Sequence, residues 1–151
     1  MACARLQKYL DEHNVRYVSM KHSPAFTAQE VAASAHIPGK EVAKSVVVKL
    51  DGAMALVVLP APEMIRMNHL KAETGADRVE LATEQEFKDH FPDCEVGAMP
   101  PFGILYEMDT FVEESLAEDE DIAFNAGTHT ELIRMSYADF EELVHPRVLR
   151  S

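Results

Sequence analysis

The sequence predicts an α/β fold in which short helices surround a mixed, mostly antiparallel, curled sheet. Three observations favour it: a strongly β-forming hairpin at 40–60, a second pair of β-forming runs within 122–135, and short amphipathic segments with helix-capping signals between the apolar runs. A chain of 151 residues has the usual length of one domain, so we expect residues 1–151 to form a single domain.

The first third of the chain is predicted to contain a helix, a strand and a second short helix. Apolar residues spaced i, i+3 and i+4 predict an amphipathic helix over about 3–13, which Asn14 can end in a left-handed conformation. A strand is expected at 16–21. The motif TAQE at 27–30 is a capping box and predicts a helix that ends near residue 35.

The hairpin at 40–60 is the strongest strand signal. Residues 45–50 and 53–59 are rich in β-branched or large apolar side chains, and Asp51-Gly52 between them is typical of a type I′ turn. Lys44 precedes the first of these strands, so we expect its ammonium group to project from the rim of the sheet. The alternative is a solvated lysine that only discourages edge pairing.

The middle of the chain continues the alternation of helices and strands. A helix is predicted over 63–74 with Gly75 at its end, and a short strand follows at 78–81. A second capping box, TEQE at 83–86, predicts a helix that Pro92 ends near residue 91.

The last third is predicted to close the sheet. The expected strands lie at 104–106, 111–112, 122–125 and 131–135. Ser136 is the predicted cap of a final helix that ends before Pro146. The acidic segment at 115–121, SLAEDED, is expected to be solvated surface.

The chain is strongly acidic. Its 14 Lys and Arg against 26 Asp and Glu give a net charge of −12, whereas proteins that grip nucleic-acid backbones are usually basic. The basic residues are unevenly placed, since residues 1–50 contain seven Lys and Arg and only four Asp and Glu. Contact with RNA would therefore be local and confined to this first third.

Cysteine usage and targeting signals favour a cytoplasmic protein with no membrane contact. Cys3 and Cys94 provide no disulfide framework, and the sequence has no C-x-x-C or H-E-x-x-H motif that would predict a metal site. The N-terminus lacks the apolar core of a signal peptide, and no run approaches the roughly 18 apolar residues of a membrane span.

Several motifs occur together in one order: a T-x-x-E helix start, a lysine entering a VVV strand with a DG turn, GAMPPFG at 97–103 and FNAGTHTELIRMSYADF at 124–140. In this combination the chain resembles the YbaK/ProX family of single-domain aminoacyl-tRNA deacylases, which are related to the editing insertion of bacterial prolyl-tRNA synthetases. The resemblance implies a barrel-like sheet with helices outside. It also implies an aminoacyl-tRNA substrate held at its acceptor end, no metal or organic cofactor, and a prolyl-tRNA synthetase as a candidate partner.

The resemblance implies a catalytic role for Lys44, Gly97 and Pro101. Lys44 would anchor the terminal nucleotide or polarise the ester carbonyl. Gly97 and Pro101 match the family's G-x-x-x-P loop, in which a glycine lets N–H groups point at one oxygen and prolines stiffen the backbone. Without the resemblance, the same loop could be an ordinary turn.

We expect further residues to contact the substrate. They are His22, Thr27, Ser45, Phe102, Gly103, Gly127 and His129. For His22 and His129, a hydrogen bond to the backbone is an open alternative to substrate binding.

The function implied is trans-editing: hydrolysis of mischarged aminoacyl-tRNA, above all tRNA(Pro) that carries a small non-cognate amino acid. An aminoacyl ester is already activated, so such a hydrolase needs a positioned water and oxyanion donors more than a strong nucleophile. Two alternatives stay open. One is a non-catalytic module of the same fold that binds aminoacyl-tRNA or a synthetase. The other is a hydrolase of a small ester unrelated to tRNA.

Overall fold

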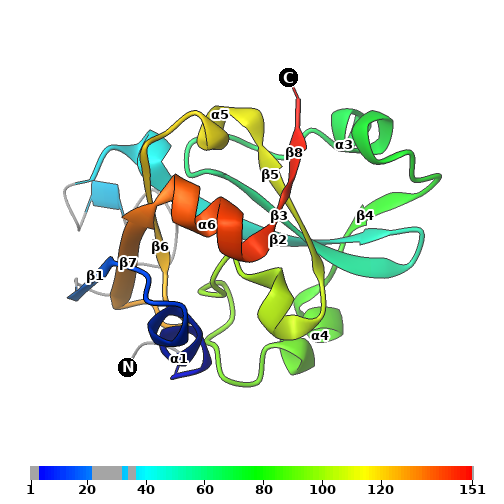
Figure 1. Cartoon of the computed structure of the whole chain (residues 1–151). Helices are drawn as coiled ribbons and strands as arrows, with labels where there is room; N and C mark the ends of the chain where they lie inside the picture. The colour runs from blue at the N-terminus through cyan, green and yellow to red at the C-terminus, as the bar shows by residue number, and fades with distance from the viewer. Residues whose placement is uncertain (1–3, 22–31, 34–36, 151) are drawn as a thin grey trace.

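The computed structural model describes residues 4–21, 32–33 and 37–150, and within them eight strands form one mixed sheet (Figure 1). The strands are β1 (Tyr17–Lys21), β2 (Val42–Leu50), β3 (Ala53–Pro60), β4 (Val79–Leu81), β5 (Asp109–Glu113), β6 (Asp121–Asn125), β7 (Glu131–Ser136) and β8 (Arg147–Leu149). Their order is β1-β7-β6-β2-β3-β5-β8, and β4 pairs with β2 off this path. The predicted α/β class with a mixed sheet is confirmed.

Short helices lie around the sheet. They are α1 (Ala4–Glu12), α3 (Met67–Thr74), α4 (Glu84–Phe87), α5 (Glu114–Ala117) and α6 (Tyr137–Val144), with 3₁₀ turns η1 (Gly39–Glu41), η2 (Lys88–His90) and η3 (Gly103–Tyr106). The predicted caps set several boundaries. Thr83 and Glu86 form the reciprocal capping box of α4, the Ser136 hydroxyl accepts from the Asp139 N–H at the start of α6, and Gly75 ends α3 with φ of 75°.

The hairpin of β2 and β3 is confirmed in detail. Asp51 and Gly52 have φ of 51° and 87°, which is the pair of left-handed residues that a type I′ turn requires. The first strand, however, begins at Val42 rather than at residue 45. Lys44 is therefore the third residue of β2 and lies within the sheet, so the prediction that it projects from the rim is wrong.

The sheet forks along one edge of β2. This edge pairs in parallel with β6 at residues 42–43 and antiparallel with β4 at residues 48–50. Neither of these two strands pairs with the residues between.

The three parallel pairings, β2 with β6, β3 with β5, and β5 with β8, accompany four antiparallel ones, so the expected antiparallel majority is confirmed.

Different helices pack on the two faces of the sheet. Ala43, Val58 and Val112 pack with the apolar side chains of α1 and α6, and we call this side the α6 face. Residues that alternate with them, Val57 and Phe111, pack with Leu70 of α3 on the opposite side. Because successive residues of a strand point to opposite faces, Lys44 lies on this second side, which we call the Lys44 face. In Figure 1, α6 crosses in front of the sheet on the α6 face.

Some element predictions are wrong or incomplete. Residues 104–106 form the 3₁₀ turn η3 rather than a strand, because the Met108 N–H donates to the Gly103 carbonyl at 2.9 Å and Glu107 takes a left-handed φ of 58°. The helix expected from residue 63 begins at Met67, and the one expected to reach residue 91 ends at Phe87 and continues as a 3₁₀ turn. Strand β8 was not predicted.

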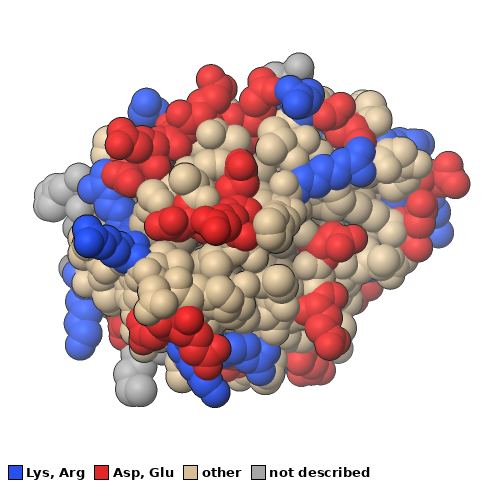
Figure 2. Space-filling model, viewed as in Figure 1, with Lys and Arg blue, Asp and Glu red and all other residues tan. Residues whose placement is uncertain are grey.

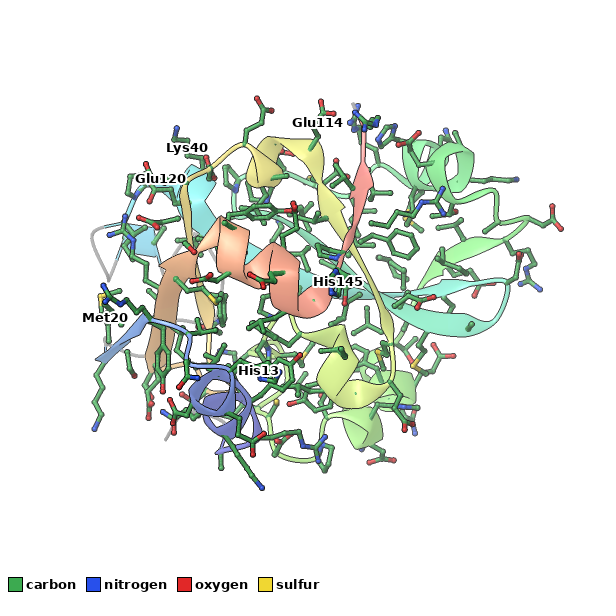
Figure 3. All side chains as sticks on the ribbon, viewed as in Figure 1. His13, Met20, Lys40, Glu114, Glu120 and His145 are labelled. Atoms are coloured by element: carbon green, nitrogen blue, oxygen red, sulfur yellow. The ribbon has the colours of Figure 1, made fainter. Side chains whose placement is uncertain are left out.

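The acidic segment is not wholly solvated surface. Residues 114–117 form α5, and Leu116 of that helix is fully buried. Figure 2 shows acidic side chains gathered over α5, the turn that follows it and α6 on the viewed side. Lys40 and Glu120 project from one end of the molecule (Figure 3), and the Lys40 charge opposes the rise that burial causes in the pKa of Asp119.

Candidate active site

Lys44 is a desolvated cation within a strand. Its Nζ donates to the Ala61 carbonyl at 3.1 Å, and its side chain is half-buried. Burial lowers the pKa of the Lys44 ammonium, and the Glu63 carboxylate offsets part of that shift. Within the described residues, Lys44 has no ion-pair partner within 4 Å, so its charge is available to a ligand.

The parallel pairing of β6 with β2 puts Asn125 on the same face of the sheet as Lys44, one residue past the last paired positions. The parallel register pairs Val42 with Ala123, so the next residues on the same face are Lys44 in β2 and Asn125 in β6. The cross-strand partner of Asn125, Leu132, packs with Val42 and Ala123, which confirms the face. The Asn125 Oδ1 atom is buried and accepts no hydrogen bond from the described residues.

Such an unmet acceptor is unfavourable in a free protein. A buried oxygen without a donor typically costs about 1–3 kcal/mol, and native structures contain few of them. The Thr128 hydroxyl, three residues further along, is another of the buried side-chain atoms without a partner among the described residues. An unmet acceptor on the same face as a desolvated cation is typical of a site that awaits a polar ligand.

The G-x-x-x-P loop and the turn at 126–129 are bonded to each other. The Gly127 N–H donates to the Ala98 carbonyl at 2.9 Å, and the Gly127 carbonyl accepts from the Glu95 N–H at 2.8 Å. His129 Nε2 lies 2.8 Å from the Val96 carbonyl, and the His129 N–H donates to Glu95 Oε1 at 3.0 Å. β6 leads from the side of Lys44 directly into this turn, so Gly97, Gly127 and His129 lie together beyond the fork.

His129 therefore has the backbone contact that the sequence left as its alternative role. Its ring also lies against Gly97, where a Cβ atom would be 3.4 Å from His129 Cε1. Gly97 and Gly127 have positive φ, at 86° and 94°. Both glycines are needed for the backbone path, and Gly97 also for contact with the histidine.

The loop does not present a row of free N–H groups to an oxyanion. The Gly97 N–H points at the Met99 sulfur at 3.2 Å, and the Ala98 N–H donates to the Glu95 carbonyl at 3.0 Å. Pro100 and buried Pro101 have no N–H at all. The role of oxyanion donor expected for this loop is therefore not supported by its geometry.

Three expected substrate residues lie away from Lys44. Phe102 is fully buried against the rings of Phe124 and Phe140 in the core of the α6 face. The Gly103 N–H donates to the Thr110 hydroxyl, and a Cβ on Gly103 would lie 2.5 Å from the Met108 carbonyl oxygen.

Ser45 follows Lys44 in β2, so its side chain points to the α6 face. These three residues build the scaffold rather than the site. His22 and Thr27, the remaining expected contacts, lie outside the described residues.

A buried carboxyl lies on the same face as Lys44. Val58 pairs with Val112, so Glu113 is one residue further along β5, in line with Leu59 and with Lys44 across β3. Glu113 is 6 % exposed, and burial raises the pKa of its carboxyl while the His69 and Arg66 charges oppose the rise. The face therefore holds a cation and an acid, both desolvated, with one strand between them.

The described residues contain no cluster of three or more His, Cys, Asp or Glu that could hold a metal ion. No helix in the described part of the chain has the length and apolar character needed to cross a membrane.

A model of the aminoacyl-tRNA editing domain matches residues 22–143. The chain belongs to this family. The multifunctional Ser/Thr-tRNA deacylase ProXp-y of Escherichia coli K12 is 29% identical over 112 residues, which span 71% of this chain and 66% of that protein. The proline–tRNA ligase of Bacillus mycoides KBAB4 is 29% identical over 89 residues, 59% of this chain. The match covers only 16% of the ligase.

Solved structures share the fold of this editing domain at low identity. A candidate trans-editing enzyme for prolyl tRNA synthetase superposes with a TM-score of 0.82 at 19% identity, over 97% of this chain and 93% of that one. The hypothetical protein APE2540 superposes with a TM-score of 0.85 at 20% identity, over 95% and 96% of the two chains.

The sequence analysis of this editing domain did not predict that Asn125 lies on the same face as Lys44. A polar residue at the end of the apolar run IAFN, directly before a glycine turn, was the available signal. What the sequence could not supply was the parallel pairing of β6 with β2, which brings Asn125 to Lys44.

Proposed function

We propose that this editing domain is an aminoacyl-tRNA deacylase that acts in trans, and that its substrate is tRNA(Pro) carrying a small non-cognate amino acid. The observation that supports it is Lys44, a half-buried cation without an ion-pair partner in the described chain, at a fork of the sheet in a member of the editing family. The proposal rests on this site and on the relatives, among them a Ser/Thr-tRNA deacylase and proline–tRNA ligases.

The proposed chemistry is direct hydrolysis of the ester. A water oxygen bonds to the carbonyl carbon, negative charge develops on the carbonyl oxygen, and the bond to the ribose oxygen then breaks. The ribose oxygen takes a proton, and the products are the free amino acid and uncharged tRNA. Lys44 stabilises the developing oxyanion, which in a water-poor site is commonly the largest single catalytic contribution. The neighbouring ribose 2′-hydroxyl helps to orient the water.

The uneven charge of the domain suits contact with the end of a tRNA only. The acidic helix α6 covers one face of the sheet, and Lys44 lies on the other. Several basic residues of the first third are paired with carboxylates, such as Arg5 with Asp93 and Lys49 with Glu86. Few cations therefore remain for phosphates, which favours a short contact at the acceptor end over a broad RNA-binding surface.

The test is a deacylation panel. Purified protein is incubated with tRNA(Pro) charged separately with alanine, cysteine, serine, threonine and proline, and the remaining ester is measured over time. We expect at least one mischarged ester to be hydrolysed about 10-fold or more faster than Pro-tRNA(Pro), since an editing site must spare the cognate product. Serine and threonine on other tRNAs extend the panel toward the substrates in the name of the Escherichia coli relative.

Three results would contradict the proposal. Hydrolysis that persists in the Lys44→Met variant would assign the activity to another site or to a contaminant. Binding of aminoacyl-tRNA without hydrolysis would favour the non-catalytic module, and cleavage of simple esters but no aminoacyl-tRNA would favour a small-ester hydrolase.

A further inference from the structure

Asn125 offers the site a buried acceptor that no described residue bonds. Its Oδ1 atom receives no hydrogen bond from the described residues, although it lies on the same face as the Lys44 ammonium, one strand away. Paired strands are about 4.8 Å apart, and the last paired residues of β2 and β6, Ala43 and Phe124, directly precede Lys44 and Asn125. A ligand that enters the fork can therefore reach both side chains. Lys44 can only donate, and the buried Asn125 oxygen can only accept.

A ligand that satisfies both side chains must carry an acceptor and a donor close together. An aminoacyl ester has this pattern, because its carbonyl oxygen and its α-ammonium group are attached to neighbouring carbons. The ammonium group is a donor without acceptor capacity, so it cannot bond to Lys44 and is repelled by it. The Asn125 carboxamide oxygen is an uncharged acceptor on this face that can receive it.

We propose that Asn125 reads the free α-ammonium group of the aminoacyl ester whose carbonyl oxygen is held by Lys44. This inference rests on the proposed function and adds a specificity residue to it. The amide suits this role better than a carboxylate would. An aspartate beside Lys44 would form an ion pair with it and raise its pKa, whereas an asparagine accepts the hydrogen bond and leaves the lysine charge for the oxyanion.

The test compares two esters that differ only in the amine. A short acceptor-stem RNA is charged either with alanine or with propionic acid, which has the same carbon chain without the α-amino group. The value of kcat/KM is measured for both esters with the wild type, Asn125→Ala and Asn125→Ser. The ratio of the two kcat/KM values is independent of the fraction of protein that is folded, so a partly unfolded variant still gives a usable result.

We expect the wild type to prefer the alanyl ester and Asn125→Ala to lose about 10- to 100-fold of this preference, the range for a hydrogen bond to a charged group. The propionyl rate should stay near that of the wild type. Asn125→Ser, which keeps an oxygen, should retain part of the preference. Thr128→Val tests the neighbouring unmet hydroxyl as a rival. Ser115→Ala, which removes a buried unmet hydroxyl on α5, is the matched control and should leave the ratio unchanged.

An equal loss for both esters in Asn125→Ala, or no loss, would overturn the inference while the deacylase activity itself stands. A change of the ratio in Thr128→Val but not in Asn125→Ala would also overturn it and would assign the amine to the threonine. A wild type that cleaves neither ester would refute the proposed function and this inference together.

Discussion

Two lysines on strand β2, Lys44 and Lys49, have opposite electrostatic environments. Lys49 forms ion pairs with Glu86 at 2.5 Å and Glu80 at 3.6 Å, and these contacts, led by the hydrogen bond to Glu86, raise its pKa. Among the described residues, the Lys44 ammonium group bonds only to the Ala61 carbonyl, and burial lowers its pKa. The two residues differ by five positions and point to opposite faces of the sheet.

The difference indicates different purposes. At Lys49 the surroundings favour the charged side chain, so the contacts stabilise the fold around the capping box of α4. At Lys44 the surroundings disfavour the charge, so the fold gains little from keeping it. A cation that is retained where it is unfavourable is a candidate for function.

The largest expected effect comes from removing each lysine in turn. Lys44→Met should lower kcat/KM for deacylation by about 100- to 1000-fold, the usual loss for an oxyanion donor. Its melting temperature should stay the same or rise, because a half-buried ammonium is replaced by an apolar side chain. Lys49→Met should do the reverse, with unchanged kcat/KM and a lower melting temperature. Kinetics and thermal melts on the two variants check this, and equal kinetic losses would erase the contrast between the lysines.

A smaller loss of activity is expected from Gly97→Ala, and Gly52→Ala is its control. Both have φ near 86°, so alanine at either position should cost about 1–2 kcal/mol of unfolding free energy through backbone strain. At Gly97 the added Cβ would contact the His129 ring at 3.4 Å, whereas at Gly52 it meets nothing within 4 Å. Gly97→Ala should therefore lower kcat/KM by roughly 10-fold, as for a modest misplacement of site residues.

Gly52→Ala should leave kcat/KM unchanged. Denaturant unfolding and steady-state kinetics measure both quantities. If the two variants lose the same activity, the contact between Gly97 and the His129 ring has no special part in catalysis.

The smallest effects are expected from changes to the contacts of Lys49, at the capping box of α4. Thr83→Ala removes the cap of α4 and should lower the unfolding free energy by about 1 kcal/mol without a change in rate. The Lys49 hydrogen bond holds the pKa of Glu86 at about 2, below its ordinary value of 4.5. The stability that the ionised Glu86 carboxylate contributes is therefore present above pH 4.5 and is lost as the pH falls through 2.

Glu86→Gln should flatten the acid side of the stability curve, measured as melting temperature against pH. An unchanged acid slope in that variant would show that the pair does not stabilise the fold.

Local signals predicted the elements better than the site. The DG pair fixed the hairpin register through its turn, and the capping residues at Thr83 and Ser136 marked two helix starts, because these features depend on neighbours in the sequence. The strand expected at 104–106 failed because Gly103 and Glu107 close a 3₁₀ turn around apolar residues that would also suit a strand.

The site depends on contacts between distant segments. Lys44 was found from the family motif, but its neighbour Asn125 is 81 positions away and reaches it only through a parallel pairing. The misplacement of Ser45 was avoidable, since the period of two along a strand already puts it opposite Lys44. The true role of Gly103, close packing against Met108 and Thr110, has no sequence signal beyond the glycine itself.

The pH dependence of deacylation tests the central claim, that Lys44 acts as a desolvated ammonium. Single-turnover rates of wild type and Lys44→Arg on an acceptor-stem RNA charged with propionic acid, whose ester has no amine to titrate, are measured from neutral to alkaline pH, and the uncatalysed hydrolysis is subtracted. The wild-type rate should fall as Lys44 deprotonates, with an apparent pKa below the ordinary lysine value of 10.5. Arginine stays charged throughout this range, so Lys44→Arg should be slower but should lose the alkaline fall. The same alkaline fall in both proteins would contradict the account.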